Sequence, residues 1–244
     1  MKRLTILMAM LIATSGWAYD ELDLIKLKAT NTCKGCDLSG LDLPEVFEGG
    51  ADLRGANLTN ANLPGVDFAY TKLGGVDLRG ANLSGANLER ASISIIYEPY
   101  EGPNLEGVNL SGANLKYAQL NGINLKKANL TRANLTNALL SQANLIEANL
   151  SGANLTNASL ASALIGSANL SGAKLTNVNM YNSDLSGAIL SKTQLDDANL
   201  YDANLTNVDF TKDISMKNIQ LDKAIYCNTT MPWGVLNDGC KDDE

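Results

Sequence analysis

The chain has 244 residues, carries a formal net charge of −7, and is 45% hydrophobic but only 5% aromatic. It contains no histidine, the commonest general base and metal ligand, so the composition disfavours an ordinary globular enzyme. The acidic balance argues against direct binding to DNA phosphates, which requires clustered Lys and Arg.

Residues 1–18 have the features of a secretory signal peptide. Lys2 and Arg3 form a basic start, and the apolar run that follows is too short to cross a bilayer. Gly16 and Ala18 supply the small residues that signal peptidase requires, so we expect cleavage after Ala18. The alternative is an uncleaved membrane anchor. Because no later apolar run is long enough to span a membrane, we expect no stable membrane insertion after cleavage.

Residues 19–35 precede the regular part of the sequence. Between residues 19 and 30, charged residues alternate with Leu22, Leu24 and Leu27. We interpret this segment as a short helix, although a strand-like alternation is also present.

A repeat of five residues then continues almost to the end of the chain. We call the large apolar residue of each unit its centre. From Leu105 to Phe210, 22 consecutive centres lie five residues apart, and 19 of them are Leu. Ala stands two positions before the centre in 15 of these units, and Asn or Asp stands directly before it in 15. An earlier block in another phase runs to Ile93, with its start predicted at Leu38, and a last block contains Met216, Leu221 and Tyr226.

The five-residue period fits neither a helix nor a plain strand. Helices place apolar residues 3.6 positions apart and strands place them two apart. Here the Ala and the centre, two positions apart, point to one side of a short strand segment. The next step of three requires the chain to turn a corner, and four such corners close a square. We therefore expect coils of about 20 residues that stack about 4.8 Å apart through backbone hydrogen bonds.

The stretch ANLSGANLTNASL, residues 148–160, carries the motif most clearly. It resembles the pentapeptide-repeat family, whose motif is A(D/N)LXX, and the resemblance covers roughly residues 36–228. It implies an all-β fold, a right-handed quadrilateral β-helix of about nine coils. The motif encodes the scaffold, so it says little about function.

The clearest departure from the repeat is a predicted loop at residues 92–103. The step from Ile93 to Leu105 is twelve residues, where two units would take ten. Tyr97 and Tyr100 lie in this loop and are candidate contacts for a protein partner, because projecting Tyr residues are good contact anchors. The alternative is an insertion that folds back on the wall, since long surface loops are tolerated at little cost.

Two smaller irregularities also interrupt the repeat. Strict counting places Glu48 at a centre, where an unpaired carboxylate would be buried at high cost. We therefore expect the chain to leave the square within residues 44–50, with Val46 or Phe47 filling the core. A later step of six between centres predicts one extra residue near Lys212.

Two tyrosines form a second candidate contact site. Tyr181 and Tyr201 are 20 residues apart, so they should stack on one side of neighbouring coils. We consider them candidate contacts for a partner. The alternative is that they are isolated surface side chains, which are normal in proteins.

Both ends of a stacked β-helix need covers, because they would otherwise expose apolar centres and unpaired strand edges. We assign residues 19–35 to an N-terminal cap and residues 229–244 to a C-terminal cap with an acidic tail. In the second cap, four apolar residues are expected to cover the end: Met231, Trp233, Val235 and Leu236.

All four cysteines lie near these ends. About nine coils at roughly 4.8 Å each would separate the ends by about 40 Å, whereas a disulfide needs Cα atoms within about 7 Å. We therefore expect the pairs Cys33–Cys36 and Cys227–Cys240, which an exported protein would form. The alternatives for Cys33 and Cys36 are a redox site or a zinc site. The first normally opens a helix in an α/β fold and the second requires four nearby ligands, so neither is favoured.

The sequence thus predicts an exported, non-enzymatic scaffold that binds a protein partner, with no catalytic residues, metal or cofactor. The expected compartment is the periplasm, the lumen of an internal membrane system or the extracellular space. The family resemblance also implies an alternative, because some members mimic DNA with an acidic rod and bind DNA gyrase. An export signal and cysteine-bearing ends depart from that pattern.

Overall fold

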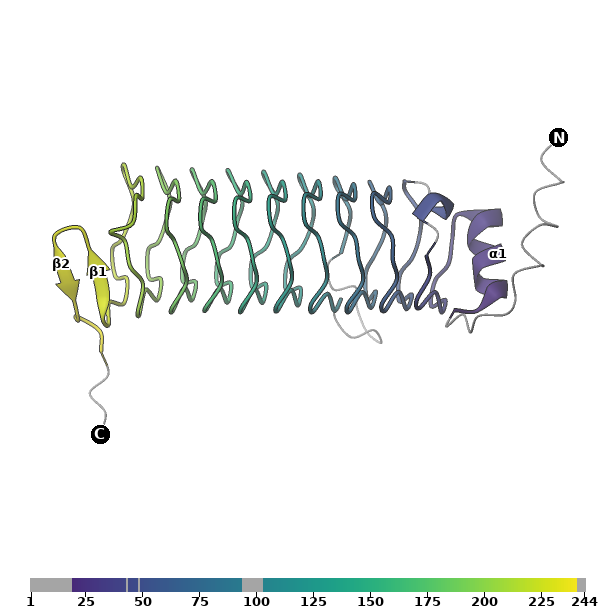
Figure 1. The fold of residues 1–244 in the computed structure, drawn as a ribbon, viewed down its shortest axis with the longest axis horizontal. Helices are drawn as coiled ribbons and strands as arrows, with labels where there is room; N and C mark the ends of the chain where they lie inside the picture. Colours follow the sequence, from purple (N-terminus) through teal and green to yellow (C-terminus); the bar gives the residue numbers. More distant parts are fainter. Residues whose placement is uncertain (1–18, 43, 48, 94–102, 241–244) are drawn as a thin grey trace.

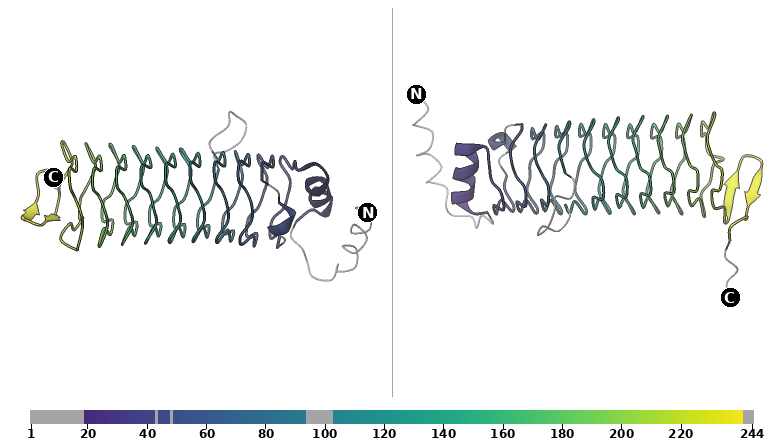
Figure 2. Two further views of the ribbon diagram at one scale, coloured as in Figure 1. Left: turned by 90° about the horizontal axis from the view of Figure 1, so that it is seen from above. Right: turned by 180° about the vertical axis from the view of Figure 1, so that it is seen from behind.

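The computed structural model describes residues 19–42, 44–47, 49–93 and 103–240, which form an elongated rod of stacked coils (Figure 1). Residue numbers rise steadily from one end of the rod to the other. Figure 2 shows the same straight stack from two further sides. The predicted signal peptide, residues 1–18, lies outside the described residues.

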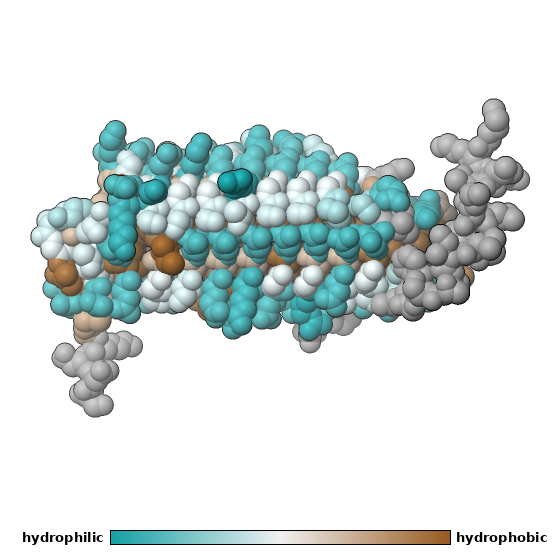
Figure 3. Space-filling model, viewed as in Figure 1, coloured by the Kyte–Doolittle hydropathy of each residue, from teal (hydrophilic) through white to brown (hydrophobic). Residues whose placement is uncertain are grey.

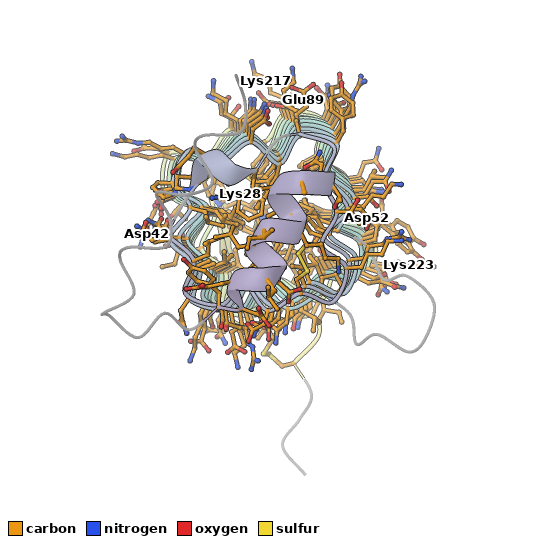
Figure 4. The ribbon with its side chains drawn as sticks, turned by 90° about the vertical axis from the view of Figure 1, so that its right-hand side faces the viewer. Lys28, Asp42, Asp52, Glu89, Lys217 and Lys223 are labelled. Atoms are coloured by element: carbon orange, nitrogen blue, oxygen red, sulfur yellow. A yellow bond between two sulfur atoms is a disulfide. The ribbon has the colours of Figure 1, made fainter. Side chains whose placement is uncertain are left out.

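Each coil has four sides, and each side pairs with the same side of the next coil. Within one coil, the paired residues Asn124, Asn129, Asn134 and Leu139 mark four faces, which we call A, B, C and D in that order. Each forms a parallel bridge with the residue 20 positions later. The 20-residue period confirms the predicted β-helix solenoid, which Figure 4 shows along its axis.

The interior of the rod is filled by the centres and by the alanines two positions before them. Leu150 and Ala148 are buried, whereas Asn149 between them is exposed. Backbone groups of the same segment bond to both neighbouring coils: Asn149 N–H donates to the Ala128 carbonyl at 2.9 Å, and Leu150 N–H donates to the Asn169 carbonyl at 2.7 Å. Burial of one Leu side chain contributes about 1.5–3 kcal/mol, so the column of centres is the main source of stability.

The corner residues explain the remaining letters of the motif. The second residue after each centre has a positive φ, 66° at Gly152 and 59° at Asn157, a conformation that Gly and Asn tolerate best. The amide of the first corner residue bonds to the Asn before the centre, as Ser151 N–H does to Asn149 Oδ1 at 3.1 Å. Asn is therefore favoured at the outward position because its side chain satisfies a backbone donor at the corner.

The insertion after Ile93 is longer than the sequence count suggested. Ser92 pairs with Gln119, 27 residues later, where regular coils need 20. Ile93 and Leu105 are therefore successive centres, and the segment between them carries seven extra residues rather than two. The count was wrong because it assumed that one of the intervening residues occupied a centre. Residues 94–102 lie outside the described residues.

The irregular segment near residue 47 departs from the square as expected. A short 3-10 helix, η2, spans Pro44–Val46. Phe47 is buried, and its ring lies edge-on to that of Phe68 with centroids 4.9 Å apart. The prediction that an apolar neighbour fills the core is thus confirmed for Phe47. Glu48 lies outside the described residues.

A helix lies across the first end of the rod (Figure 1). Helix α1 spans Glu21–Thr30, as expected from the sequence. Its N-cap Asp20 accepts a hydrogen bond from the amide of the second helical residue, and Asn31 ends it in the left-handed conformation. Leu24 and Leu27 are its buried residues. In the described part of the chain, no helix is both long enough and apolar enough to cross a membrane.

The disulfides pair as predicted. Cys33 bonds to Cys36 and Cys227 bonds to Cys240, with Cα atoms 5.3 Å and 4.6 Å apart. The ladder begins at Thr32, whose bridge lies one residue before Cys33, so the coils start slightly before the predicted residue 36. Cys33 therefore occupies a centre and Cys36 an alanine position, and both are buried.

The last coils contain the predicted extra residue and end in a hairpin. Gln194 pairs with Ser215, 21 residues later, which confirms one additional residue between them. Strand β1, Thr229–Met231, pairs antiparallel with strand β2, Gly234–Leu236. Strand β1 also continues the ladder, because Thr230 pairs with Asp209 of the preceding coil.

The expected cover at this end is only partly formed. Met231 is buried, but Trp233 is 69% exposed and Val235 is also exposed, so the prediction that these two residues cover the end is wrong. Val235 lies opposite Thr230 in the hairpin, and such pairs share one side of a sheet. That side is the outer one, because the residues flanking Thr230 point inward. Trp233 lies between the strands.

Candidate functional site

Face D and its two corners differ from the rest of the wall. Where faces A, B and C carry mostly Asn or Asp at the outward position, face D carries Gln119, Leu139 and Ser159. Leu139 is exposed. Two clusters of tyrosines and cations border this face. We call the whole surface the aromatic face; it comprises Tyr70, Arg90, Lys116, Tyr117, Leu139, Tyr181, Tyr201 and Lys223.

The first cluster lies at the corner between faces C and D. Tyr70, Arg90 and Tyr117 each stand two residues after a centre, and each has a positive φ of 56–58°. Because they occupy the same corner of three successive coils, their side chains lie next to one another. The Arg90 guanidinium carbon lies 5.8 Å from the Tyr70 ring centroid and 5.3 Å from that of Tyr117. Lys116 Nζ lies 5.7 Å from the Tyr117 centroid. Tyr70 and Tyr117 are 59% and 43% exposed, so their rings are accessible.

The second cluster lies at the corner between faces D and A. The rings of Tyr181 and Tyr201 are stacked with centroids 5.8 Å apart and planes 14° apart. Their predicted stacking is therefore present. Lys223 Nζ lies 5.3 Å from the Tyr201 centroid, and a hydrogen bond with Tyr201 raises the pKa of Lys223. A role for these tyrosines as partner contacts stays a prediction.

Together the clusters cross one side of the rod diagonally. The first lies nearer the N-terminal end and the second nearer the C-terminal end, with Leu139 between them. From the coil of Tyr70 to that of Tyr201 there are six coil spacings, or about 29 Å at roughly 4.8 Å each. In Figure 4, Asp52 of face D and Lys223 lie on one side of the rod, and Asp42 of face B lies on the other.

Face B provides the contrast. Its side-chain amides bond from coil to coil: Asn82 Nδ2 donates to Asn62 Oδ1 at 2.8 Å, and Asn109 Nδ2 donates to Asn82 Oδ1 at 3.0 Å. Figure 3 looks onto this face, where a hydrophilic band runs along much of the rod beside a paler band and gives way to a brown patch near the C-terminal end. The amides satisfy one another, so apart from the exposed Ile189 this face is mainly polar.

An ion-pair cluster lies at the N-terminal end of face D. Asp52 Oδ2 is 2.6 Å from Arg54 Nη2 and 3.4 Å from Lys34 Nζ. The hydrogen bond from Arg54 lowers the pKa of Asp52 to about 2. A carboxylate with a lowered pKa stabilises the fold at and above its ordinary pKa, and this contribution is lost as the pH falls through the folded value. The contribution of Asp52 should therefore disappear as the pH falls from about 4 to about 2.

We predict that Arg54→Gln raises the pKa of Asp52 toward the ordinary value near 3.9 without reaching it. The lost guanidinium bond is the main cause of the present shift, and Lys34 remains beside the carboxylate. NMR titration of the side-chain carboxyl carbons measures the pKa of Asp52 in the wild type and in the variant. Arg79→Gln is the matched control. Arg79 forms its ion pair with Asp77, so its loss should leave the pKa of Asp52 unchanged. An unchanged Asp52 pKa in Arg54→Gln would contradict the assignment.

The sequence-predicted loop tyrosines, Tyr97 and Tyr100, lie outside the described residues. Among the described residues, the acidic and cysteine side chains that approach one another as metal ligands would are Asp23, Cys33 and Cys36, with ligand atoms within 4.8 Å. Both sulfurs are joined in the disulfide, and thiolate is the form that binds metals. Their burial also keeps them from a thiol substrate, so the arrangement favours a structural role.

Sequence reasoning missed the first cluster. Its signal was present at corner positions, where Tyr70 and Arg90 are 20 residues apart. Tyr117 stands 27 residues after Arg90, so it joins the column only when the insertion is counted as seven residues. The apparent separation therefore hid the stacking of Arg90 between two tyrosines.

Comparisons with known proteins agree with this architecture. A family model described as pentapeptide repeats matches eight segments that together cover more than half of the chain: residues 33–68, 62–94, 101–132, 123–161, 133–172, 158–191, 165–200 and 173–211. No curated protein matches the chain.

Three solved structures illustrate the likeness. HetL, a pentapeptide repeat protein involved in heterocyst differentiation regulation in Nostoc sp. strain PCC 7120, is 31% identical over 84% of this chain and 91% of its own, with a TM-score of 0.38. A pentapeptide repeat protein from the Arabidopsis thaliana thylakoid lumen is 33% identical over 42% of this chain and 68% of its own, with a TM-score of 0.25. QnrB1, a plasmid-mediated fluoroquinolone resistance protein, is 16% identical over 78% of this chain and 92% of its own, with a TM-score of 0.66, which shows a shared fold.

Proposed function

Because the chain belongs to the pentapeptide-repeat family, we propose that it is an exported, non-enzymatic scaffold that binds a protein partner through the aromatic face. The observation that carries this proposal is the gathering of exposed Tyr, Arg and Leu side chains on one side of the rod; the exposed Leu164 of face A and Ile189 of face B lie outside this group. Tyr and Arg are enriched among the residues that dominate binding energy at protein interfaces.

The rod supports such a role by holding these side chains in place. Tyr70, Arg90 and Tyr117 stand on backbone that is bonded to both neighbouring coils. Less conformational freedom is then lost when a partner binds, and this preorganisation favours affinity. The polar face B would remain in contact with solvent.

Export is the second part of the proposal. The basic start and apolar run of residues 1–18 motivate it, and the two disulfides of the structure are consistent with an oxidising compartment. We predict that N-terminal sequencing of the exported protein begins at Tyr19, because Ala18 completes the cleavage site. A mature chain that still begins at Met1 would overturn both the cleavage and the export proposal.

Site-specific photo-cross-linking in exporting cells tests the partner-binding part. A photoreactive phenylalanine analogue would replace Tyr117 or Tyr181 on the aromatic face, and Ser151 or Ser171 beside face B as controls. We expect the same protein adduct from both tyrosine positions and from neither serine position. Equal adducts from all four positions, or none from the tyrosine positions, would contradict the proposal.

The family resemblance offers DNA mimicry toward gyrase as the alternative, and the charges of the wall do not favour it. Between Thr32 and Asn228, the described residues include 14 Lys and Arg and 16 Asp and Glu. Duplex DNA carries about one negative charge per 1.7 Å, or roughly 25 over a rod of about 43 Å. The wall is thus close to neutral where a mimic needs a dense negative charge. We expect the purified chain to leave gyrase supercoiling, and its inhibition by a fluoroquinolone, unchanged.

A further inference from the structure

We infer that the partner presents carboxylate groups to Arg90 and Lys116, so that an acidic segment of the partner docks on the N-terminal half of the aromatic face. This inference rests on the proposed function and adds the chemistry of the partner. Its first basis is the charge of Arg90 in the first cluster.

Within the described part of the wall, no carboxylate forms an ion pair with Arg90. The ion pairs among the described residues involve Asp52, Asp77, Glu147 and Asp209, and in this part of the chain neither Arg90 nor Lys116 lies within 4.0 Å of a carboxylate oxygen. Glu89, next to Arg90 in the sequence, instead accepts a hydrogen bond from Asn114 Nδ2 at 3.3 Å. Among the residues that the structure describes, both cations of this corner thus lack an ion-pair partner.

The guanidinium of Arg90 is also preorganised. It lies between the rings of Tyr70 and Tyr117, and its Nη1 donates to Tyr70 Oη at 3.5 Å. A guanidinium carries five N–H donors in a planar fork that fits a carboxylate. The two rings and the bond to Tyr70 Oη hold the guanidinium at the corner, and that bond uses one of its five N–H donors. A carboxylate could therefore bind without first ordering the side chain.

The charges around the cluster favour an anion. Lys72 on face D is exposed, and Lys116 lies beside the Tyr117 ring, so three cations surround the corner with Arg90. Glu89 opposes them, as does Asp67 on face C, whose Oδ1 accepts hydrogen bonds from the Asn87 side chain and from a backbone amide. Asp52, which pairs with Lys72 in the ladder, is itself neutralised by Arg54 and Lys34. This corner is thus locally positive on a chain whose net charge is −7.

Arg132 provides a matched control. Like Arg90, it stands two residues after a centre, has a φ of 56° and is exposed. Among the described aromatic rings, none is stacked on its guanidinium. Arg90→Gln and Arg132→Gln therefore remove the same charge from the same kind of backbone position. They differ in that two tyrosine rings flank the guanidinium of Arg90.

The direct test measures binding of a random copolymer of Glu and Tyr to the purified full chain, with a copolymer of Lys and Tyr as the opposite-charge probe. We expect the acidic copolymer to bind, and to bind more weakly as salt is added. Arg90→Gln should weaken binding by on the order of tenfold, the effect of one lost charge-assisted hydrogen bond. Arg132→Gln should bind like the wild type, and Arg90→Lys should be intermediate because it keeps the charge but not the fork.

Three results would overturn the inference: no binding of the acidic copolymer, equal binding of the basic one, or equal losses in Arg90→Gln and Arg132→Gln. Cross-linking separates this failure from failure of the proposed function. Adducts at Tyr117 should weaken in Arg90→Gln and persist in Arg132→Gln. Undiminished adducts in Arg90→Gln would overturn the acidic partner and leave the proposed function standing, whereas absent adducts in the wild type would overturn the proposed function itself.

Discussion

Replacing Leu150 with Asp should cost several kcal/mol of folding free energy and unfold the middle of the rod. Leu150 is fully buried in the column of centres, so a carboxylate there would have no water and no partner. Removal of the Leu side chain alone typically costs about 2–5 kcal/mol. Denaturant unfolding followed by circular dichroism measures the total loss.

Asn149→Asp is the matched control, because it introduces the same charge one residue earlier. Asn149 is exposed, and its Oδ1 accepts a hydrogen bond from Ser151 N–H that an Asp oxygen would still accept. We expect a loss of less than about 1 kcal/mol, as for most surface substitutions. Similar losses for both variants would contradict the alternation of inward and outward residues.

The damage from Leu150→Asp should spread from its own coil to the coils of Leu130 and Leu170. Each coil contacts its neighbours along the rod, so stability is close to a sum of local terms. Hydrogen exchange should therefore rise most in these three coils and least near α1 and the hairpin. A uniform rise along the chain would instead show that the rod unfolds as one cooperative unit.

The fold was largely predictable because its information is local and repeated. Each five-residue unit contains its own inward residues, its outward Asn and its corner residues. The 20-residue coil therefore follows from the spacing of the centres alone. The register across the insertion was not predictable in the same way. Between Ile93 and Leu105 no residue marks a centre, and a pattern cannot show how many residues leave the wall.

The candidate site was predictable only where the period held. Tyr181 and Tyr201 are one coil apart in the sequence and stack in the structure. The pairing of Arg90 with Tyr117 depends on the length of the insertion and was therefore missed. Trp233 illustrates a different limit: hydrophobicity alone suggested a cover, whereas the hairpin that places it beside the last coil leaves it exposed.

Cys240→Ser should destabilise the C-terminal end of the rod by about 3 kcal/mol, the chain-entropy estimate for a loop of this size. The disulfide joins residues 13 positions apart and holds the segment before Cys240 against the last coil. In that segment, Asn237 Oδ1 accepts a hydrogen bond from Asn228 N–H at 2.8 Å. Gly239 packs so closely on Ile225 that an added Cβ would lie 2.8 Å from its Cγ2 atom. Without the disulfide, this segment should separate from the coil.

The loss of structure in Cys240→Ser should be measured in the last coil rather than by the fluorescence of Trp233. Trp233 is already 69% exposed, so its fluorescence should change little. Hydrogen exchange should instead rise around Tyr226, a half-buried residue that packs against the core. Cys33→Ser is the matched control at the other end: it should loosen the first coil and leave both the middle of the rod and Tyr226 unchanged, because damage passes only between neighbouring coils. Peptide mapping without reduction checks the pairing of the cysteines. A cross-link between Cys36 and Cys227 within one chain would contradict this pairing, since these residues lie at opposite ends of the stack.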